Sequence, residues 1–245
     1  MIPSPIPKVL SSIRRHQVRA LLMGGQACVL YGAAEFSRDI DLALLAEPDN
    51  LTRLREAMAE LEASPIAVPP LSIDYLSRGH AAHLRCAAAG VEGVRIDLMS
   101  VMRGVAPFPE LWARRTTLAI GSDEVDVLSL PDLVQAKKTQ RDKDWPMIRR
   151  LIEADYFAHR SDPTAARVAF WLEELRSPSL LIELAASEPA AAAASQRAAV
   201  HAARRGAADE IERALADEQA AETAADRIWW EPLKRELESI RRSSR

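Results

Sequence analysis

Cysteine is scarce in this sequence, and signals for membranes and export are missing. The 245 residues include two cysteines, Cys28 and Cys86, with no CxxC spacing, so we expect neither a cysteine metal cluster nor a dithiol redox centre. No apolar run approaches the roughly 20 residues needed to cross a bilayer. The segment 1–8 lacks the apolar core of a signal peptide. We therefore expect a cytoplasmic protein.

Several common enzyme signatures are also absent. The chain has no G-x-x-x-x-G-K-[ST] P-loop, no G-x-G-x-x-G fingerprint and no G-x-S-x-G elbow. These absences remove the commonest ATPase, dinucleotide-binding and serine hydrolase interpretations. A net charge of −3 and a pI near 6.0 argue against broad, sequence-independent nucleic-acid binding. A local basic patch, for example at Arg149, Arg150 and Arg160, remains compatible with this charge.

The pattern of apolar residues divides the chain into two parts. Residues 1–157 alternate short apolar runs with helical patterns, which predicts an α/β (α+β) domain with a mixed sheet and flanking helices. Residues 158–245 are rich in alanine and contain one glycine, Gly206, which predicts an α-helical C-terminal region. The expected strands are 18–23, 40–45, 83–87, 94–100, 116–120 and 124–128, the last two joined through 121–123. The expected helices are 26–31, 50–61 with Asn50 as N-cap, 131–138, 144–156, 163–175, 179–186, and one or two long ones over 189–240.

Two aspartates lie at the start of the second expected strand. Asp39 and Asp41 are two residues apart, so in a strand their side chains point to the same face. Carboxylates this close repel each other and raise each other's pKa, and a divalent cation removes that penalty. Asp97 lies in another apolar strand and can join them. Three carboxylates suit two magnesium ions about 3.5–4 Å apart, with Asp97 near an attacking hydroxyl.

A glycine pair precedes these aspartates. Gly24-Gly25 follows an expected strand and opens an expected helix. Glycine allows close approach of the backbone, and amide groups at the start of a helix suit phosphate oxygens. We therefore expect a phosphate-binding turn facing the metal-binding carboxylates.

Together, Gly24-Gly25, Asp39-Ile40-Asp41 and Asp97 resemble the DNA polymerase β-like nucleotidyltransferase superfamily. The segments 130–137 and 141–144 look like its small bacterial branch, which includes the abortive-infection (type IV toxin) nucleotidyltransferases. The likeness covers about residues 18 to 155. It implies a nucleotidyltransferase-fold sheet that binds Mg²⁺ and an NTP, with ATP among the candidates.

The resemblance also implies roles for individual residues. Asp39 and Asp41 would bind both metals, and Asp97 would complete the catalytic one. The nucleotide would be held by Gly24, Gly25, Ser37, Arg38 and Lys137, the last neutralising phosphate charge. Related sequences often carry an arginine where this chain has Glu35, and Arg38 is the candidate to replace it.

Alternatives remain open for both the site and the function. Asp74 and Asp126 compete with Asp97 for the third carboxylate. His80 and His83 lack a third ligand of their type, so we expect a structural role or a place in a substrate cleft. The acceptor is a tRNA end, a protein hydroxyl or a small molecule, and the setting a toxin–antitoxin or phage-defence system. The rival is a non-catalytic nucleotide-binding or antitoxin module, with the C-terminal helices forming a homodimer or binding an antitoxin partner.

Overall fold

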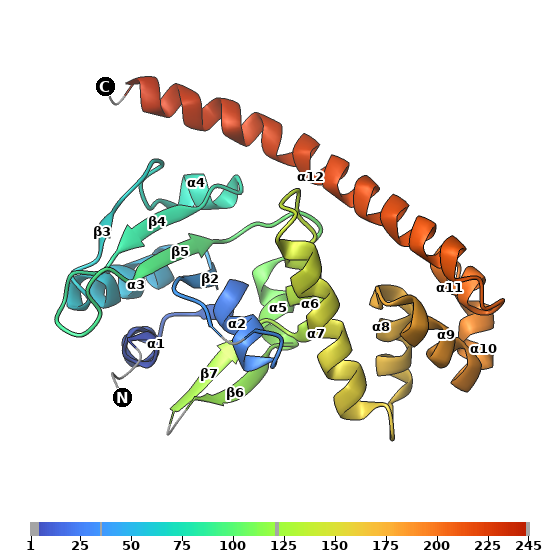
Figure 1. Ribbon diagram of the computed structural model, residues 1–245. Helices are drawn as coiled ribbons and strands as arrows, with labels where there is room; N and C mark the ends of the chain where they lie inside the picture. Colours follow the sequence, from blue (N-terminus) through green and yellow to red (C-terminus); the bar gives the residue numbers. More distant parts are fainter. Residues whose placement is uncertain (1–4, 35, 121–122, 244–245) are drawn as a thin grey trace. The chain divides into compact units, whose positions relative to one another are not determined.

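The computed structural model describes residues 5–34, 36–120 and 123–243 (Figure 1). Glu35 and two residues of the expected hairpin turn, Gly121 and Ser122, lie outside the described residues. The chain divides into two compact units. The first comprises residues 1–30, 34–136 and 229–245, and the second comprises 31–33 and 137–228. The expected domain boundary after residue 157 stays a prediction.

A seven-stranded mixed sheet forms the centre of the first unit, as the α/β pattern predicted. Its strand order is β3-β4-β5-β2-β1-β7-β6. The pairs β2–β5 and β1–β7 are parallel, and the other neighbours are antiparallel. The strands are β1 (Ala20–Met23), β2 (Ile40–Leu44), β3 (Ser64–Pro65), β4 (Ala82–Arg85), β5 (Arg95–Met99), β6 (Thr116–Ile120) and β7 (Asp123–Val127).

The central strands are the most buried part of the sheet. Every residue of β1 is buried, and in β2 only Asp41 is partly exposed. Strands covered on both faces are apolar throughout, because neither face meets water. A carboxylate inside such a strand is therefore exceptional, and its surroundings must compensate its charge.

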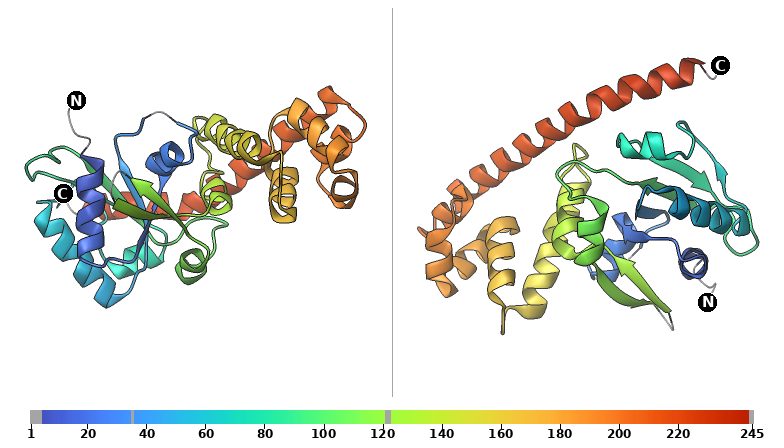
Figure 2. Two further views of the ribbon diagram at one scale, coloured as in Figure 1. Left: turned by 90° about the horizontal axis from the view of Figure 1, so that it is seen from below. Right: turned by 180° about the vertical axis from the view of Figure 1, so that it is seen from behind.

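Helices cover both faces of this sheet. They are α1 (Ile6–Arg15), α2 (Gly24–Leu30), α3 (Pro48–Glu60), α4 (Ile73–Ser77), α5 (Phe108–Ala113) and α6 (Leu130–Ala136). The helices α1 and α3 pack against each other (Figure 2), whereas α2 packs on β1 and β2. The sequence patterns did not predict α1, α4 or α5.

Asn50 has a different role from the predicted one. The helix α3 begins two residues earlier, at Pro48, so Asn50 lies inside it and is fully buried. Its side-chain amide accepts a hydrogen bond from the backbone N–H of Arg19 at 2.7 Å and donates to the carbonyls of Arg19 and Leu45. The expected N-cap is thus an internal bridge between α3 and the chain around β1, where buried backbone groups need partners.

The second unit is helical, as the composition predicted. It contains α7 (Asp144–His159), α8 (Ala165–Glu174), α9 (Pro178–Ser187), α10 (Pro189–Ala194), α11 (Ala198–Ala203) and the start of α12 (Ala208–Ser243). Trp171 and Tyr156 pack edge to face in its core at 4.9 Å between ring centroids. The region 189–240 holds three helices instead of one or two, and the last break falls at Gly206, whose φ is +69°.

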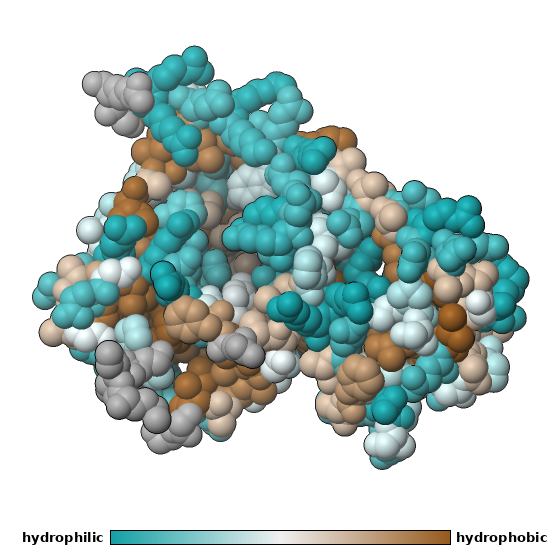
Figure 3. All heavy atoms as spheres, in the orientation of Figure 1, coloured by the Kyte–Doolittle hydropathy of each residue, from teal (hydrophilic) through white to brown (hydrophobic). Residues whose placement is uncertain are grey.

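The helix α12 belongs to both units. Residues up to 228 group with the second unit, and residues from 229 onward group with the first. Figure 3 shows hydrophilic side chains along the visible face of its C-terminal half. Among the described residues, no helix is both long and apolar enough to span a membrane.

Candidate functional site

Two of the three expected carboxylates lie side by side on neighbouring strands. The strands β2 and β5 are parallel, and Asp41 is the direct partner of Asp97. Residues opposite each other in a ladder project to the same face of the sheet. Asp39 lies just before β2 and is exposed. We call Asp39, Asp41 and Asp97 the carboxylate cluster.

A cation on the same strand compensates this cluster. The Nε atom of Arg95 donates a hydrogen bond of 2.7 Å to Oδ1 of Asp97. The pKa of Arg95 is raised by this hydrogen bond and by the negative charges of all three carboxylates. The guanidinium is therefore the counter-charge that allows the cluster to stand in an apolar sheet.

His83 supports Asp97 from the other neighbouring strand. His83 on β4 is the direct partner of Asp97, and its Nδ1 lies 2.7 Å from the same carboxylate oxygen. Burial raises the pKa of Asp97, but the hydrogen bonds from His83 and Arg95 lower it, and the balance lies below the usual value. Asp97 is thus held in its charged form.

The glycine pair lies directly against the cluster. Gly24 has a φ of +65°, and a Cβ on it would fall 1.9 Å from Oδ2 of Asp41. A Cβ on Gly25 would fall 2.4 Å from Oγ of Ser37. Only glycine allows a carboxylate and a hydroxyl to come this close to the first turn of α2. The loop is held there by Gln26, whose Nε2 donates to the carbonyl of Ser37 at 2.7 Å.

The expected basic residues, Arg38 and Lys137, each have a neighbour of their own. Arg38 is exposed, with its guanidinium carbon 5.8 Å from the ring centroid of Phe36. Lys137 belongs to the second unit, where it is buried and its Nζ lies 3.7 Å from Oδ1 of Asp144. Their roles at a nucleotide stay predictions. Glu35, at the position where related sequences carry an arginine, lies outside the described residues.

Each rival for the third carboxylate has a local partner of its own. Asp74 is an exposed residue of α4, and its Oδ2 accepts from Arg78 at 2.9 Å. Asp126 lies on β7, where its Oδ1 accepts from Arg115 at 2.9 Å and from Thr117 at 2.7 Å. Of the three candidates, Asp97 is the one that the strand register pairs with Asp41.

The two histidines have separate surroundings. His80 is buried, and its Nε2 lies 2.8 Å from Oε2 of Glu236 on α12. His83 contacts the cluster. The two therefore do not form a pair of metal ligands. His83 was expected to have a structural role or a place in a substrate cleft, and Arg95 is the neighbour of the cluster that sequence reasoning missed.

The donor set of the cluster fits a hard divalent cation, because carboxylate oxygens are the ligands that Mg²⁺ prefers. Across residues 5–34, 36–120 and 123–243, however, no group of three or more His, Cys, Asp or Glu side chains is arranged to hold a metal ion. The hydrogen bonds from Arg95 and His83 both end on one oxygen of Asp97, Oδ1.

We compared the chain with protein-family models, curated proteins and solved structures. No protein-family model matches the chain, and no curated protein matches its sequence. One solved structure that aligns with it is an antigenic nucleotidyltransferase-like protein from Paracoccidioides brasiliensis. The alignment covers 76% of this chain and 87% of that one, at 18% identity and a TM-score of 0.41. A likeness this loose carries no argument about activity.

Proposed function

We propose that this chain is a magnesium-dependent nucleotidyltransferase. It would transfer a nucleoside monophosphate from an NTP to a hydroxyl acceptor and release pyrophosphate. The observation that carries the proposal is the pairing of Asp41 with Asp97 in register on parallel strands, with Gly24 packed against Asp41. Carboxylates from neighbouring strands beside a glycine turn would suit a divalent cation, which would supply positive charge to a bound triphosphate.

Each residue of the site has a role in this proposal. Asp39 and Asp41 hold Mg²⁺, and Asp97 completes the site. When bound, Mg²⁺ would orient the α-phosphate and stabilise the charge that develops on it. Arg95 and His83 keep Asp97 charged, which is the form required both of a metal ligand and of a group that accepts the proton of the attacking hydroxyl.

The nucleotide phosphates would bind beside the cluster. Gly24 and Gly25 are partly exposed, and the hydroxyl of Ser37 lies next to Gly25. Arg38 is exposed and can neutralise phosphate charge. We assign the same role to Lys137, as the sequence resemblance implies.

The acceptor and the biological setting follow from the resemblance alone. A tRNA end, a protein hydroxyl and a small molecule such as an aminoglycoside are the acceptor classes to test. The setting that we propose is a toxin–antitoxin or phage-defence system, with a homodimer or an antitoxin partner bound through the C-terminal helices.

The charge compensation by Arg95 supports a second candidate function. Its guanidinium already compensates the three carboxylates, and the described residues hold no ready-made group of metal ligands. A protein that binds a nucleotide without turning it over would need no second cation there. This non-catalytic module, nucleotide-binding or antitoxin-type, keeps the fold and the glycine turn but transfers nothing.

The test is transfer of label from each α-³²P-labelled NTP in the presence of Mg²⁺. Total tRNA, a protein lysate and an aminoglycoside panel would be offered separately as acceptors. Asp41→Asn should reduce transfer by at least about a thousandfold, the order expected when a group that stabilises transition-state charge is removed. Asp74→Asn is the matched control, since this exposed aspartate lies outside the cluster.

The outcomes separate the two candidate functions. Transfer that depends on Asp41 but not on Asp74 supports the enzyme and identifies its acceptor class. Calorimetric binding of an NTP with no transfer to any acceptor supports the non-catalytic module. Neither transfer nor binding of any NTP would reject both.

A further inference from the structure

The first unit contains a cavity on the face of the sheet opposite the carboxylate cluster. Its volume is about 470 Å³, and Leu42 lines it. Leu42 directly follows Asp41 along β2, and successive side chains of a strand point to opposite faces. The cavity is therefore a separate site, and its volume lies in the range of roughly 300–1,000 Å³ that is typical of small-molecule pockets.

The inner wall of the cavity is apolar. Leu22 on β1 and Leu42 on β2 are direct partners and almost completely buried. Leu10 and Ile13 of α1 line the same space. These side chains offer a surface for the apolar body of a ligand.

The rim of the cavity carries more positive than negative charge. Three arginines, Arg14, Arg19 and Arg115, line it together with Glu124 and Asp126. Asp126 is already bound by Arg115 and by the hydroxyl of Thr117. Across the described part of the chain, no carboxylate lies within ion-pair distance of the Arg19 guanidinium, which leaves this cation available to a ligand.

Trp112 lies against two of the three arginines of this rim, Arg19 and Arg115. Its ring centroid lies 4.2 Å from the guanidinium carbon of Arg115 and 5.8 Å from that of Arg19. Stacking on an indole holds a guanidinium in place while its N–H groups stay open to an acceptor. The site therefore combines an apolar wall with a positioned hydrogen-bond donor.

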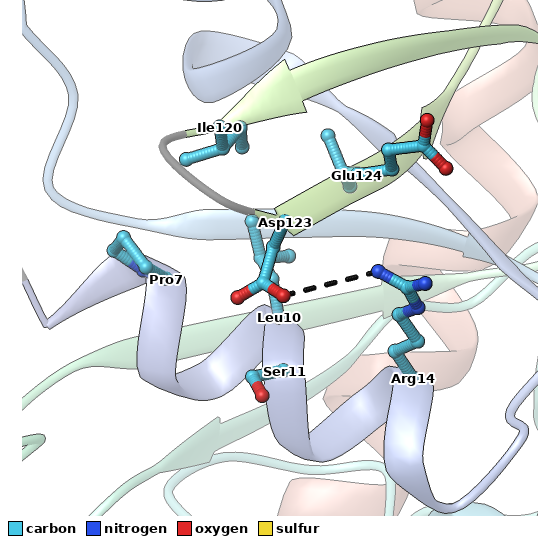
Figure 4. A pocket seen from close by; sticks show the side chains of 8 residues that line it. Pro7, Leu10, Ser11, Arg14, Ile120, Asp123 and Glu124 are labelled. Atoms are coloured by element: carbon cyan, nitrogen blue, oxygen red, sulfur yellow. Dashed lines mark ion pairs between the residues drawn. The ribbon is translucent and has the colours of Figure 1, made fainter.

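A neighbouring recess between α1 and the β6–β7 hairpin does not extend this site. Figure 4 shows Pro7, Leu10 and Ser11 facing Ile120 and Asp123 across it. Its volume is about 10 Å³, which is room for about one water molecule. Arg14 lies 3.9 Å from Asp123 at its edge. Of these two spaces, the larger cavity is the one with room for a ligand.

We propose that the 470 Å³ cavity binds a small organic anion with an apolar body. The anionic group meets Arg19, whose planar guanidinium suits carboxylate, sulfonate and phosphate oxygens. The apolar body lies on Leu22 and Leu42, beside Trp112. This site is independent of the proposed transferase reaction, because it occupies the other face of the sheet.

The test uses a pair of probes that differ in charge. 8-Anilinonaphthalene-1-sulfonate is an anion with an aromatic body, and N-phenyl-1-naphthylamine is its uncharged counterpart. We expect saturable binding of the sulfonate at about one site per chain, and roughly tenfold weaker binding of the neutral probe. This ratio is the order expected for one hydrogen-bonded charge. Equal affinity for both probes, or no saturable binding of the sulfonate, would overturn the proposal.

Two single substitutions test whether the probe binds at Arg19. Arg19→Gln should weaken the sulfonate roughly tenfold and leave the neutral probe unchanged. The matched control is Arg55→Gln, because Arg55 is exposed on α3 and does not line the cavity. Equal effects of these two variants would contradict the assigned place.

Two further variants test the cavity itself. Thr117→Trp adds volume at an exposed lining residue of β6 and should abolish binding of both probes, with circular dichroism confirming the fold. Asp41→Asn should leave binding unchanged. Unaltered affinity in folded Thr117→Trp, or lost affinity in folded Asp41→Asn, would show that the probe binds elsewhere.

Discussion

At Gly24 the backbone has a φ of +65°, and the position of a Cβ is already taken by the carboxylate of Asp41. Gly93 has a similar φ of +77°, but a Cβ there meets nothing within 4 Å. Alanine at either position carries the left-handed backbone strain of about 1–2 kcal/mol. Gly24→Ala must also displace Asp41. We expect it to lower the free energy of unfolding by at least about 1 kcal/mol more than Gly93→Ala does.

Urea denaturation of the two variants at neutral pH measures this difference. Equal destabilisation would show that Asp41 moves aside without cost, and the close packing of the glycine turn on the cluster would then have no energetic importance.

The pKa of a single residue, Tyr156, tests the packing of the second unit. Burial, followed by its hydrogen bond to Glu183, raises the pKa of Tyr156 to about 12. The sequence has three tyrosines, and an unperturbed phenol titrates near pH 10. Absorbance at 295 nm should therefore show a late-titrating tyrosine that Tyr156→Phe removes.

The same shift predicts how stability changes in alkali. The folded pKa of Tyr156 is raised, so its stabilising contribution is complete below about pH 10 and is lost as the pH rises toward the folded value. A titration in which all tyrosines ionise together near pH 10 in the folded protein would contradict the packing of Tyr156 against Glu183.

Residue spacing revealed the aspartates of the cluster but not all of their partners. Arg95 and Asp97 are two apart, so a strand places them on one face, and this signal was present in the sequence. The contact of His83 depends on the register between β4 and β5. That register is set by the loop between the strands, and the apolar pattern alone does not fix it.

At the scale of elements, the predicted strands agree with the structure within a few residues because their apolar runs end at clear turn residues. The helix α1 was missed, although Ile6, Val9, Leu10 and Ile13 are buried at helical spacing. Prolines stand before and inside its first turn, where proline is well tolerated. The helices α4 and α5 span five and six residues, too few for a period to be recognised.

The C-terminal part of α12 is attached to the first unit by an ionic contact that can be removed. Oε1 of Glu236 lies 3.0 Å from Arg78, and Oε2 lies 2.8 Å from the buried His80. Trp229 packs on Gly79, and Leu233 is buried nearby. Glu236→Ala removes the ion pair with Arg78 and the hydrogen bond with His80, and leaves a buried imidazole nitrogen without this partner.

We therefore expect Glu236→Ala to accelerate amide hydrogen exchange in residues 229–243 by roughly tenfold, the effect of losing a charged hydrogen bond. Glu238→Ala on the exposed side of the same helix is the control and should leave exchange unchanged. Equal exchange in both variants would show that apolar packing alone holds this part of α12.

At the scale of the whole molecule, composition predicted the helical C-terminal region but not how α12 is shared. Abundant alanine and a single glycine predict helices because each residue favours that conformation locally. The contact between His80 and Glu236 joins residues 156 positions apart. No local pattern encodes such a contact, so the grouping of residues from 229 onward with the first unit could not be predicted.

The proposed function requires that Asp39, Asp41 and Asp97 form one site for a divalent cation. Binding of Mn²⁺ tests this claim directly, because electron paramagnetic resonance counts the free ion whether or not an acceptor is known. The titration would compare the unaltered protein with Asp41→Asn and with Asp74→Asn, each with and without an NTP.

We predict saturable Mn²⁺ binding that an NTP strengthens, that Asp41→Asn weakens by at least about tenfold, and that Asp74→Asn leaves unchanged. No saturable binding with any NTP, or the same affinity in Asp41→Asn, would contradict the proposed metal site. Arg95 would then be the permanent counter-charge of the cluster.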